Sequence, residues 1–231
     1  MRLHRFFIDR PIEVGSFKIS DQRLLHQWKN VFRYGEGSEV ILFDGSGFEY
    51  KVRLEKLENK EAEVNIISKK EGIVSKNKIT LYQSIIKKDK MEWVAEKATE
   101  LGVSKIVPIV SERSEKKDLN LDRIRKIVIE ASEQCGRADV PEVEQIMNFE
   151  SGIMNYVGQG IAFDSSGSVF HNSYFINHNS LSFFVGPEGG WSESEIELFK
   201  SNNVKIFSLG SLTLRAETAA ITALAISKPP D

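Results

Sequence analysis

The pattern of hydrophobic positions near the carboxyl end of the chain predicts a buried strand followed by a helix. Residues 181–185 form an apolar run of the length that one buried strand requires. Residues 186–190, Gly-Pro-Glu-Gly-Gly, then break this run. Ser192 and Glu195 follow with the spacing of a capping box, in which two side chains bind the free N–H groups at a helix start. The stretch therefore predicts a strand, a glycine-rich turn and a helix.

A second unit of the same kind follows directly. Residues 204–209 form another apolar run, residues 210–213 form a turn that begins with glycine, and a helix is expected near Ala216. Both turns lie at the carboxyl ends of predicted strands, the edge at which ligands bind in open α/β sheets. Such turns are often only tight connections. Four polar residues around them favour a binding site instead: Glu188, Arg215, Glu217 and Thr218. Neither a Rossmann nor a P-loop nucleotide motif is present.

The preceding part of the chain alternates strands with helices. Residues 90–101 place small and apolar side chains on one helical face, and Gly102 should end that helix in a left-handed conformation. Gly136 is expected to stop a second helix. Strands are expected at 79–84, 106–110 and 160–163, and helices at 90–101 and 121–135. This alternation predicts a mostly parallel sheet with helices on both faces.

Residues 1–70 are rich in predicted β-structure instead. Asp44-Gly45 between two strand-like runs is a hairpin signal. A helix capped by Ser20 or Asp21 interrupts the strands. Strands are expected at 5–8, 39–43, 48–54 and 61–67, and the helix at 20–32. Several short strands with one helix predict a small barrel. We therefore divide the chain into residues 1–70, a polar linker at 71–78, and residues 79–231.

Composition and charge narrow the possible partners. The 231 residues carry a net charge of −2, so the whole chain has no polyanion-binding signal. Residues 1–33 nevertheless hold seven Arg and Lys against three acids, which is either a nucleic-acid footprint or a solvated face. One cysteine, Cys135, excludes a disulfide within the chain and fits a reducing compartment. No run approaches the roughly 20 apolar residues of a membrane helix, and no signal core is present, so we expect a cytoplasmic protein.

Two motifs near the carboxyl end of the chain resemble the signature of a known protein family. GPEGGWSESEI, residues 186–196, and LGSLTLRAETA, residues 209–219, resemble the C-terminal signature of the bacterial 16S rRNA uridine N3-methyltransferases, members of the knotted SPOUT methyltransferases. Thr213 stands where that family usually has isoleucine, and Phe32 where it has leucine. Further matches recur in family order over nearly the whole chain: MRLHRFF at residues 1–7, His26, Val31, Arg33, Gly37, residues 97–103, Pro108, Glu130, Ala131, Gln134, Arg137 and Pro141.

The resemblance implies both a fold and a function. The C-terminal part would be a SPOUT-type α/β domain with a trefoil knot, a class among the exceptions to the rule that chains rarely thread loops. The N-terminal part would be a PUA-like β-barrel that binds RNA. The protein would be a homodimer that uses S-adenosylmethionine, and no metal, to methylate N3 of a uridine in 16S rRNA of the small ribosomal subunit.

The resemblance also assigns the cofactor to the two turns. The residues concerned are Gly186, Glu188, Gly190, Leu209, Gly210 and Leu214. Glycine lets a ligand approach the backbone closely. Leu209 and Leu214 would pack against the adenine, although both also suit a core. Glu188 would bind the ribose hydroxyls or the amino group, or would accept hydrogen bonds from the first amides of the following helix.

Arg215 and Glu217 are the candidate catalytic residues. The helix dipole disfavours a cation at a helix start, so Arg215 either has a function there, such as stabilising a uracil anion or binding RNA phosphate, or pairs with Glu217 or with an acid across the dimer. A carboxylate can accept the N3 proton, and Glu217 and Glu188 are both candidates for this base.

The candidate RNA contacts combine cations and aromatic residues near the N-terminus. Phosphates attract positive charge, and unstacked bases stack on rings. Arg137 follows a predicted helix, where a cation is also an ordinary favourable placement. His26 also suits an ordinary surface position. The candidates are Arg2, Arg5, His26, Arg33 and Arg137.

Two other functions compete with methyl transfer. One is a non-catalytic RNA-binding or ribosome-assembly factor on the same scaffold, against which the intact turns and Arg215 argue. The other is a small-molecule α/β enzyme whose glycine-rich turn binds an anion, against which the basic, aromatic N-terminus argues.

Overall fold

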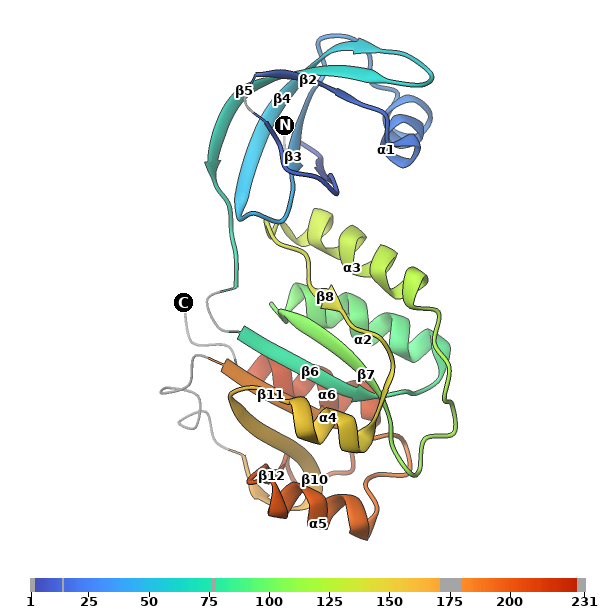
Figure 1. Cartoon of the computed structure of the whole chain (residues 1–231), viewed down its shortest axis with the longest axis vertical. Coiled ribbons are helices and arrows are strands. Elements are labelled where there is room, and N and C mark those ends of the chain that lie inside the picture. Colours follow the sequence, from blue (N-terminus) through green and yellow to red (C-terminus); the bar gives the residue numbers. More distant parts are fainter. Residues whose placement is uncertain (1–2, 14, 76–77, 171–179, 228–231) are drawn as a thin grey trace. The chain divides into compact units, whose positions relative to one another are not determined.

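The chain forms two compact units. The computed structural model describes residues 3–13, 15–75, 78–170 and 180–227 (Figure 1). The N-terminal unit contains the chain up to Val74 together with Ser132–Val140. The C-terminal unit contains Ser75–Ala131 and the chain from Pro141 on. The division into 1–70, 71–78 and 79–231 stays a prediction.

The N-terminal unit is built on one five-stranded sheet. Its order is β1-β3-β4-β5-β2, and only the β1–β3 pairing is parallel. The strands are β1 (Arg5–Phe7), β2 (Ser16–Ile19), β3 (Glu39–Phe43), β4 (Phe48–Leu57) and β5 (Ala62–Glu71). The hairpin predicted at Asp44-Gly45 is confirmed, because β3 and β4 pair antiparallel across it. The sequence pattern missed β2, which has only four residues.

One interrupted helix covers the core of this sheet. Asp21 is its N-cap and accepts hydrogen bonds from the backbone N–H of Arg23 and Leu24. The helix continues from α1 (Gln22–His26) into one π-helical turn, η1 (Gln27–Val31). Trp28 of that turn is fully buried and packs edge-on against Phe6. The single helix predicted over residues 20–32 is therefore present in two forms.

The C-terminal unit is a parallel sheet with helices. Every strand pairing in it is parallel. The strands are β6 (Lys78–Ser84), β7 (Lys105–Val110), β8 (Glu142–Val143), β9 (Met147–Asn148), β10 (Gln159–Val169), β11 (Ser180–Val185) and β12 (Lys205–Ser208). The helices are α2 (Lys88–Glu100), α3 (Leu121–Cys135), α4 (Phe149–Asn155), α5 (Glu193–Ser201) and α6 (Ala216–Ile226). The last turn of α3, from Ser132 on, belongs to the N-terminal unit. The predicted parallel sheet is confirmed, whereas the short elements β8, β9 and α4 were missed.

Packing on this sheet places helices in two groups. One core cluster joins sheet residues such as Tyr82 and Phe184 to Phe149 of α4 and Phe199 of α5. Tyr82 and Phe184 stack with their ring centroids 4.5 Å apart. Helix α6 packs against α2 and against β11. In Figure 1, α4 lies in front of the sheet and α6 behind it. Helices on both faces agree with the prediction from the sequence pattern, although α4 itself was missed.

The helix ends follow the sequence signals closely. Gly102 (φ +86°) follows α2 and Gly136 (φ +93°) follows α3, each in the left-handed conformation that glycine adopts easily. At the start of α5 the Ser192 hydroxyl accepts from the Glu195 N–H, and the Glu195 carboxylate accepts from the Ser192 N–H. The predicted capping box is therefore confirmed.

Strand order fixes where a ligand can bind. The sheet runs β12-β10-β11-β6-β7-β8, so the chain builds from β6 towards β7 and β8 and then returns to β10 on the other side of β6. A reversal of this kind opens a crevice at the carboxyl ends of the strands. Both predicted turns lie at this edge, because they follow β11 and β12.

Candidate functional site

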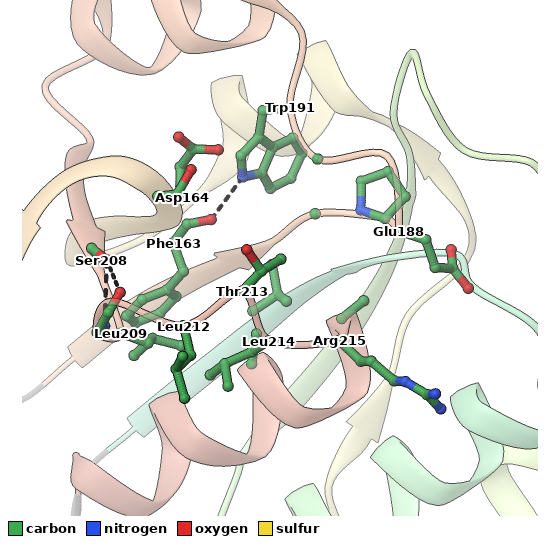
Figure 2. Close-up of a pocket in the computed structure, with 18 residues that line it drawn as sticks. Phe163, Asp164, Glu188, Trp191, Ser208, Leu209, Leu212, Thr213, Leu214 and Arg215 are labelled. Carbon is green, nitrogen blue, oxygen red and sulfur yellow. Dashed lines mark hydrogen bonds between the residues drawn. The ribbon is translucent and has the colours of Figure 1, made fainter.

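A pocket of about 350 Å³ lies at the carboxyl ends of the strands in the C-terminal unit (Figure 2). Three segments form its wall, from β10, from the turn after β11 and from the turn after β12. The lining residues are Phe163, Asp164, Ser165, Val185, Gly186, Pro187, Glu188, Gly190, Trp191, Ser208, Leu209, Gly210, Leu212, Thr213, Leu214, Arg215, Ala216 and Ala219.

The turn after β11 depends on glycine at two of its positions. The Gly190 N–H donates to the Pro187 carbonyl at 3.0 Å, which closes a four-residue turn. Gly190 has φ +67°, a backbone conformation that residues other than glycine rarely adopt. A Cβ at Gly186 would lie 3.2 Å from the ring of Trp191, so glycine lets this ring pack against the backbone.

Trp191 connects this turn to the next strand of the pocket wall. Its ring is buried, and its indole N–H donates to the Phe163 carbonyl of β10 at 3.1 Å. The bond holds the turn after β11 against β10, and Figure 2 shows it. Sequence reasoning did not select Trp191, although a tryptophan between a glycine turn and a capping box is a usable signal.

The turn after β12 is closed by a serine. The Ser208 hydroxyl donates to the Gly210 carbonyl at 2.9 Å and accepts from the Gly210 N–H at 3.3 Å. Gly210 has φ +130°, and no atom lies within 4 Å of the Cβ that another residue would place there. Leu212 is 79% exposed at this wall, so the turn presents a bare apolar side chain at the pocket.

All the predicted cofactor residues line this one pocket: Gly186, Glu188, Gly190, Leu209, Gly210 and Leu214. Glu188 is exposed at the wall, whereas the cap of α5 is formed by Ser192 and Glu195. The alternative role for Glu188, as a partner of the first helix amides, is therefore not the observed one. The pocket residues that sequence reasoning missed include Asp164, whose carboxylate accepts from the N–H and hydroxyl of Ser166.

Only one of the two candidate catalytic residues lies in the pocket wall. Arg215 is the exposed N-cap residue of α6 and lines the pocket. Figure 2 shows Arg215 on the same side of the pocket as Glu188 and opposite Asp164. Glu217 is not part of the lining, and its carboxylate lies 3.2 Å from the ammonium of Lys90 on α2. The suggested pairing of Arg215 with Glu217 is thus replaced by a Lys90–Glu217 pair.

Two of the residues predicted to contact RNA, Arg5 and Arg137, have buried side chains. The Arg5 side chain is 7% exposed, and its guanidinium lies 2.6 Å from the Glu49 carboxylate. It also donates to the Arg137 carbonyl at 3.1 Å. The Arg137 side chain is 6% exposed and donates twice to the Asp139 carboxylate, at 2.9 and 2.7 Å. Both guanidinium groups are thus held by partners within the N-terminal unit.

The other predicted RNA contacts have different positions. His26 and Arg33 are exposed, and Arg33 has φ +55° at the end of the interrupted helix. Arg2 lies outside the described residues. Beside Arg33, Phe32 stacks on Tyr34 with ring centroids 5.4 Å apart, so an aromatic pair accompanies the cation.

Comparison with known protein families identifies the family to which this chain belongs. A family model described as an RNA methyltransferase domain matches residues 74–228. The chain belongs to the RNA methyltransferase family. A second model, an RNA methyltransferase PUA domain, matches residues 29–67. This chain thus combines a mixed α/β methyltransferase domain with a PUA-like domain.

Similar proteins agree with this assignment over almost the full chain. The chain is 31% identical to the ribosomal RNA small subunit methyltransferase E of Rickettsia conorii, over 97% of this chain and 95% of the relative. It is 29% identical to the Bacillus subtilis protein of the same name, over 96% and 94%.

Two solved structures of this family are closely similar. A putative methyltransferase from Legionella pneumophila, in complex with the bound cofactor SAM, has a TM-score of 0.91 and 30% identity over 98% of this chain and 97% of that one. A ribosomal RNA small subunit methyltransferase E from Neisseria gonorrhoeae, bound to S-adenosyl methionine, has a TM-score of 0.87 and 32% identity, with coverage of 97% and 96%.

Among the described residues, no helix has the length and apolar character needed to cross a membrane. Within the same residues, no group of three or more His, Cys, Asp or Glu side chains is arranged to hold a metal ion.

The burial of Arg5 leads to a stability prediction. Arg5→Ala should lower the free energy of unfolding by roughly 3 kcal/mol, because it leaves the buried Glu49 carboxylate without its closest partner. Arg33→Ala is the matched control and should change it by no more than about 0.5 kcal/mol, since Arg33 is exposed. Urea denaturation of the full chain measures both. Equal stabilities for the two variants would contradict the structural role of Arg5.

Proposed function

We propose that this protein transfers the methyl group of S-adenosylmethionine to N3 of a uridine in 16S rRNA of the small ribosomal subunit. The observation that carries the proposal is the pocket between the middle of β10 and the turns after β11 and β12, which gathers all the residues predicted for the cofactor. Relatives named for the small-subunit ribosomal RNA, and similar structures with bound S-adenosylmethionine, support the substrate and the cofactor.

The residues of the pocket fit this cofactor. A volume of about 350 Å³ lies within the range of small-molecule sites. The side chains of Leu209, Leu212 and Leu214 supply an apolar surface for the adenine. The carboxylates of Asp164 and Glu188 suit the hydroxyl donors and positive charges of the rest of the molecule. When bound, S-adenosylmethionine supplies an already activated methyl group.

Residues of this chain would accept the N3 proton of the uracil and stabilise its negative charge. N3 methylation requires loss of the imide proton, and the negative charge then lies on the uracil oxygens. Arg215 is exposed at the pocket, where its guanidinium can stabilise that charge. Glu188, on the same side of the pocket in Figure 2, is the carboxylate that we propose as proton acceptor. Glu217 is held by Lys90 outside the lining and is the weaker candidate.

The target uridine must be accessible to this pocket. A paired uridine hides N3 in its hydrogen bond, so the substrate nucleotide is unpaired or flipped out of its helix. We propose that the N-terminal unit, as an RNA-binding PUA-like barrel, contributes His26 and Arg33 to holding the RNA. Both are exposed, unlike Arg5 and Arg137.

The knot, the location in the cell, the oligomeric state and the absence of a metal belong to the same proposal. The connection from β12, at the sheet edge, to α6, which packs on α2 and β11, returns across the carboxyl ends of β10 and β11. We propose that this return is the trefoil knot of the SPOUT methyltransferases.

We also propose a cytoplasmic homodimer that functions without a metal. Light scattering that gave a monomer with full activity would contradict the dimer.

The cofactor pocket is tested by filling it. Gly210→Trp should abolish S-adenosylmethionine binding, because the space beside Gly210 is open and the indole would occupy the pocket. Gly37→Trp is the matched control, since Gly37 also has a left-handed φ and open space but lies in the N-terminal unit. Calorimetry on the folded variants measures the affinity. An unchanged affinity in Gly210→Trp would place the cofactor elsewhere.

Catalysis is tested at Arg215. Arg215→Ala should lower methyl transfer by about 10²–10³, the order expected for one lost electrostatic stabiliser, while cofactor and RNA still bind. Tritiated-methyl transfer to 16S rRNA measures the rate, and mass spectrometry of 16S rRNA from cells with and without the gene identifies the modified base. RNA that is bound but never methylated would identify a non-catalytic RNA-binding factor.

RNA binding is tested at Arg33. Arg33→Ala should weaken binding to 16S rRNA and flatten its salt dependence by a log–log slope of roughly 0.7–0.9, the amount expected for one phosphate contact. The affinity for S-adenosylmethionine should not change. Filter binding at several salt concentrations measures the slope, and an unchanged slope would remove Arg33 from the RNA surface.

A further inference from the structure

A loop outside the pocket holds the glycine-rich turn in place. This loop, residues 111–114, follows β7, and neither Arg113 nor any other of its residues lines the pocket. The Arg113 guanidinium donates to the Gly189 carbonyl at 3.0 Å. The turn that it reaches is the one closed by the bond from the Gly190 N–H to the Pro187 carbonyl. Arg113 therefore fixes the turn from its outer side.

The position of Gly189 explains why this contact matters for the pocket. Gly186, Pro187, Glu188 and Gly190 line the pocket, but Gly189 does not. With its carbonyl bound to Arg113, the peptide after Gly189 cannot rotate without breaking that bond. Glu188 lies one residue before Gly189 in the same turn, so this bond restrains the backbone next to Glu188. A Cβ at Gly189 would lie 3.2 Å from the Cβ of Arg113, which leaves little room for any other residue.

A second set of bonds joins the same loop to the start of α5. The Glu112 N–H donates to the Glu195 carboxylate at 2.9 Å, and the Ser194 hydroxyl donates to the Glu112 carboxylate at 3.0 Å. Hydrogen bonds from the hydroxyls of Ser192 and Ser194 hold the pKa of Glu112 below its usual range. The buried Glu195 carboxylate thus serves the capping box and the loop together.

The loop itself has a fixed shape. The side chains of Ser111 and Ser114 are buried, and their hydroxyl oxygens lie 2.8 Å apart. The Ser111 N–H donates to the Ser114 hydroxyl, and the Ser114 N–H donates to the Ser111 carbonyl. A closed turn of this kind restrains the backbone that carries Glu112 and Arg113. Their side chains can therefore hold the turn after β11 in a defined position.

We infer that Arg113 is a positioning residue for the cofactor: through Gly189 it holds the turn and Glu188 in the shape that S-adenosylmethionine requires. The bonds of Glu112 to the α5 cap support the same wall from its other end. The inference rests on the proposed function, because it takes S-adenosylmethionine as the ligand of this pocket. It assigns Arg113 to the cofactor and not to RNA, although its side chain is exposed.

The test compares three variants of the full chain. Arg113→Ala should raise the dissociation constant for S-adenosylmethionine about tenfold, the loss of one charge-assisted hydrogen bond. Arg113→Lys keeps a donor and should recover part of this affinity. Arg123→Ala is the matched control, because Arg123 is exposed on α3 and pairs with Glu92. Calorimetry measures the affinities, and thermal melting should give the same midpoint for all three variants.

Steady-state methyl transfer separates positioning from other roles. In Arg113→Ala, the KM for S-adenosylmethionine should rise and the KM for RNA should stay at the wild-type value. A variant with wild-type cofactor affinity would overturn the inference, and so would a rise confined to the KM for RNA. If the wild-type protein binds no S-adenosylmethionine, the proposed function fails. If the wild-type protein binds it and Arg113→Ala binds it equally well, only the inference about Arg113 fails.

Discussion

Parallel pairing at the centre of the C-terminal sheet is the constraint on which the site depends. β11 lies between β10 and β6, and β12 lies on the outer side of β10, all in the same direction. Parallel strands end at one edge, so the turns after β11 and β12 meet there beside β10. Glycine at positions 186, 190 and 210 allows these connections to turn sharply beside one another. The pocket follows from this meeting and not from any single motif.

Hydrogen bonds within the pocket wall and from outside it give this edge a defined shape. Trp191 ties the turn after β11 to β10, and Ser208 closes the turn after β12. Arg113 and Glu195 join the same wall to the loop after β7. Trp191 and Ser208 line the pocket, whereas Arg113 and Glu195 support its wall from outside the lining. Preorganised groups of this kind raise affinity, because little freedom remains to be lost on binding.

Charge in the N-terminal unit has two separate uses. Arg5 and Arg137 are buried and paired with carboxylates, where removal of one partner would leave an uncompensated charge. His26 and Arg33 remain exposed. A count of basic residues along the chain treats all four alike. Only the exposed ones can take part in the RNA binding that we propose for this unit.

The sequence by itself determined the local elements, because caps, glycine turns and apolar runs act through neighbouring residues. It predicted the capping box at Ser192, the end of α2 at Gly102 and the parallel character of the sheet. Short elements with weak periodicity, such as α4, were missed. The tertiary structure alone decided which residues meet, since that depends on strand order. It buried Arg5, paired Glu217 with Lys90, grouped residues 132–140 with the N-terminal unit and brought Arg113 to Gly189.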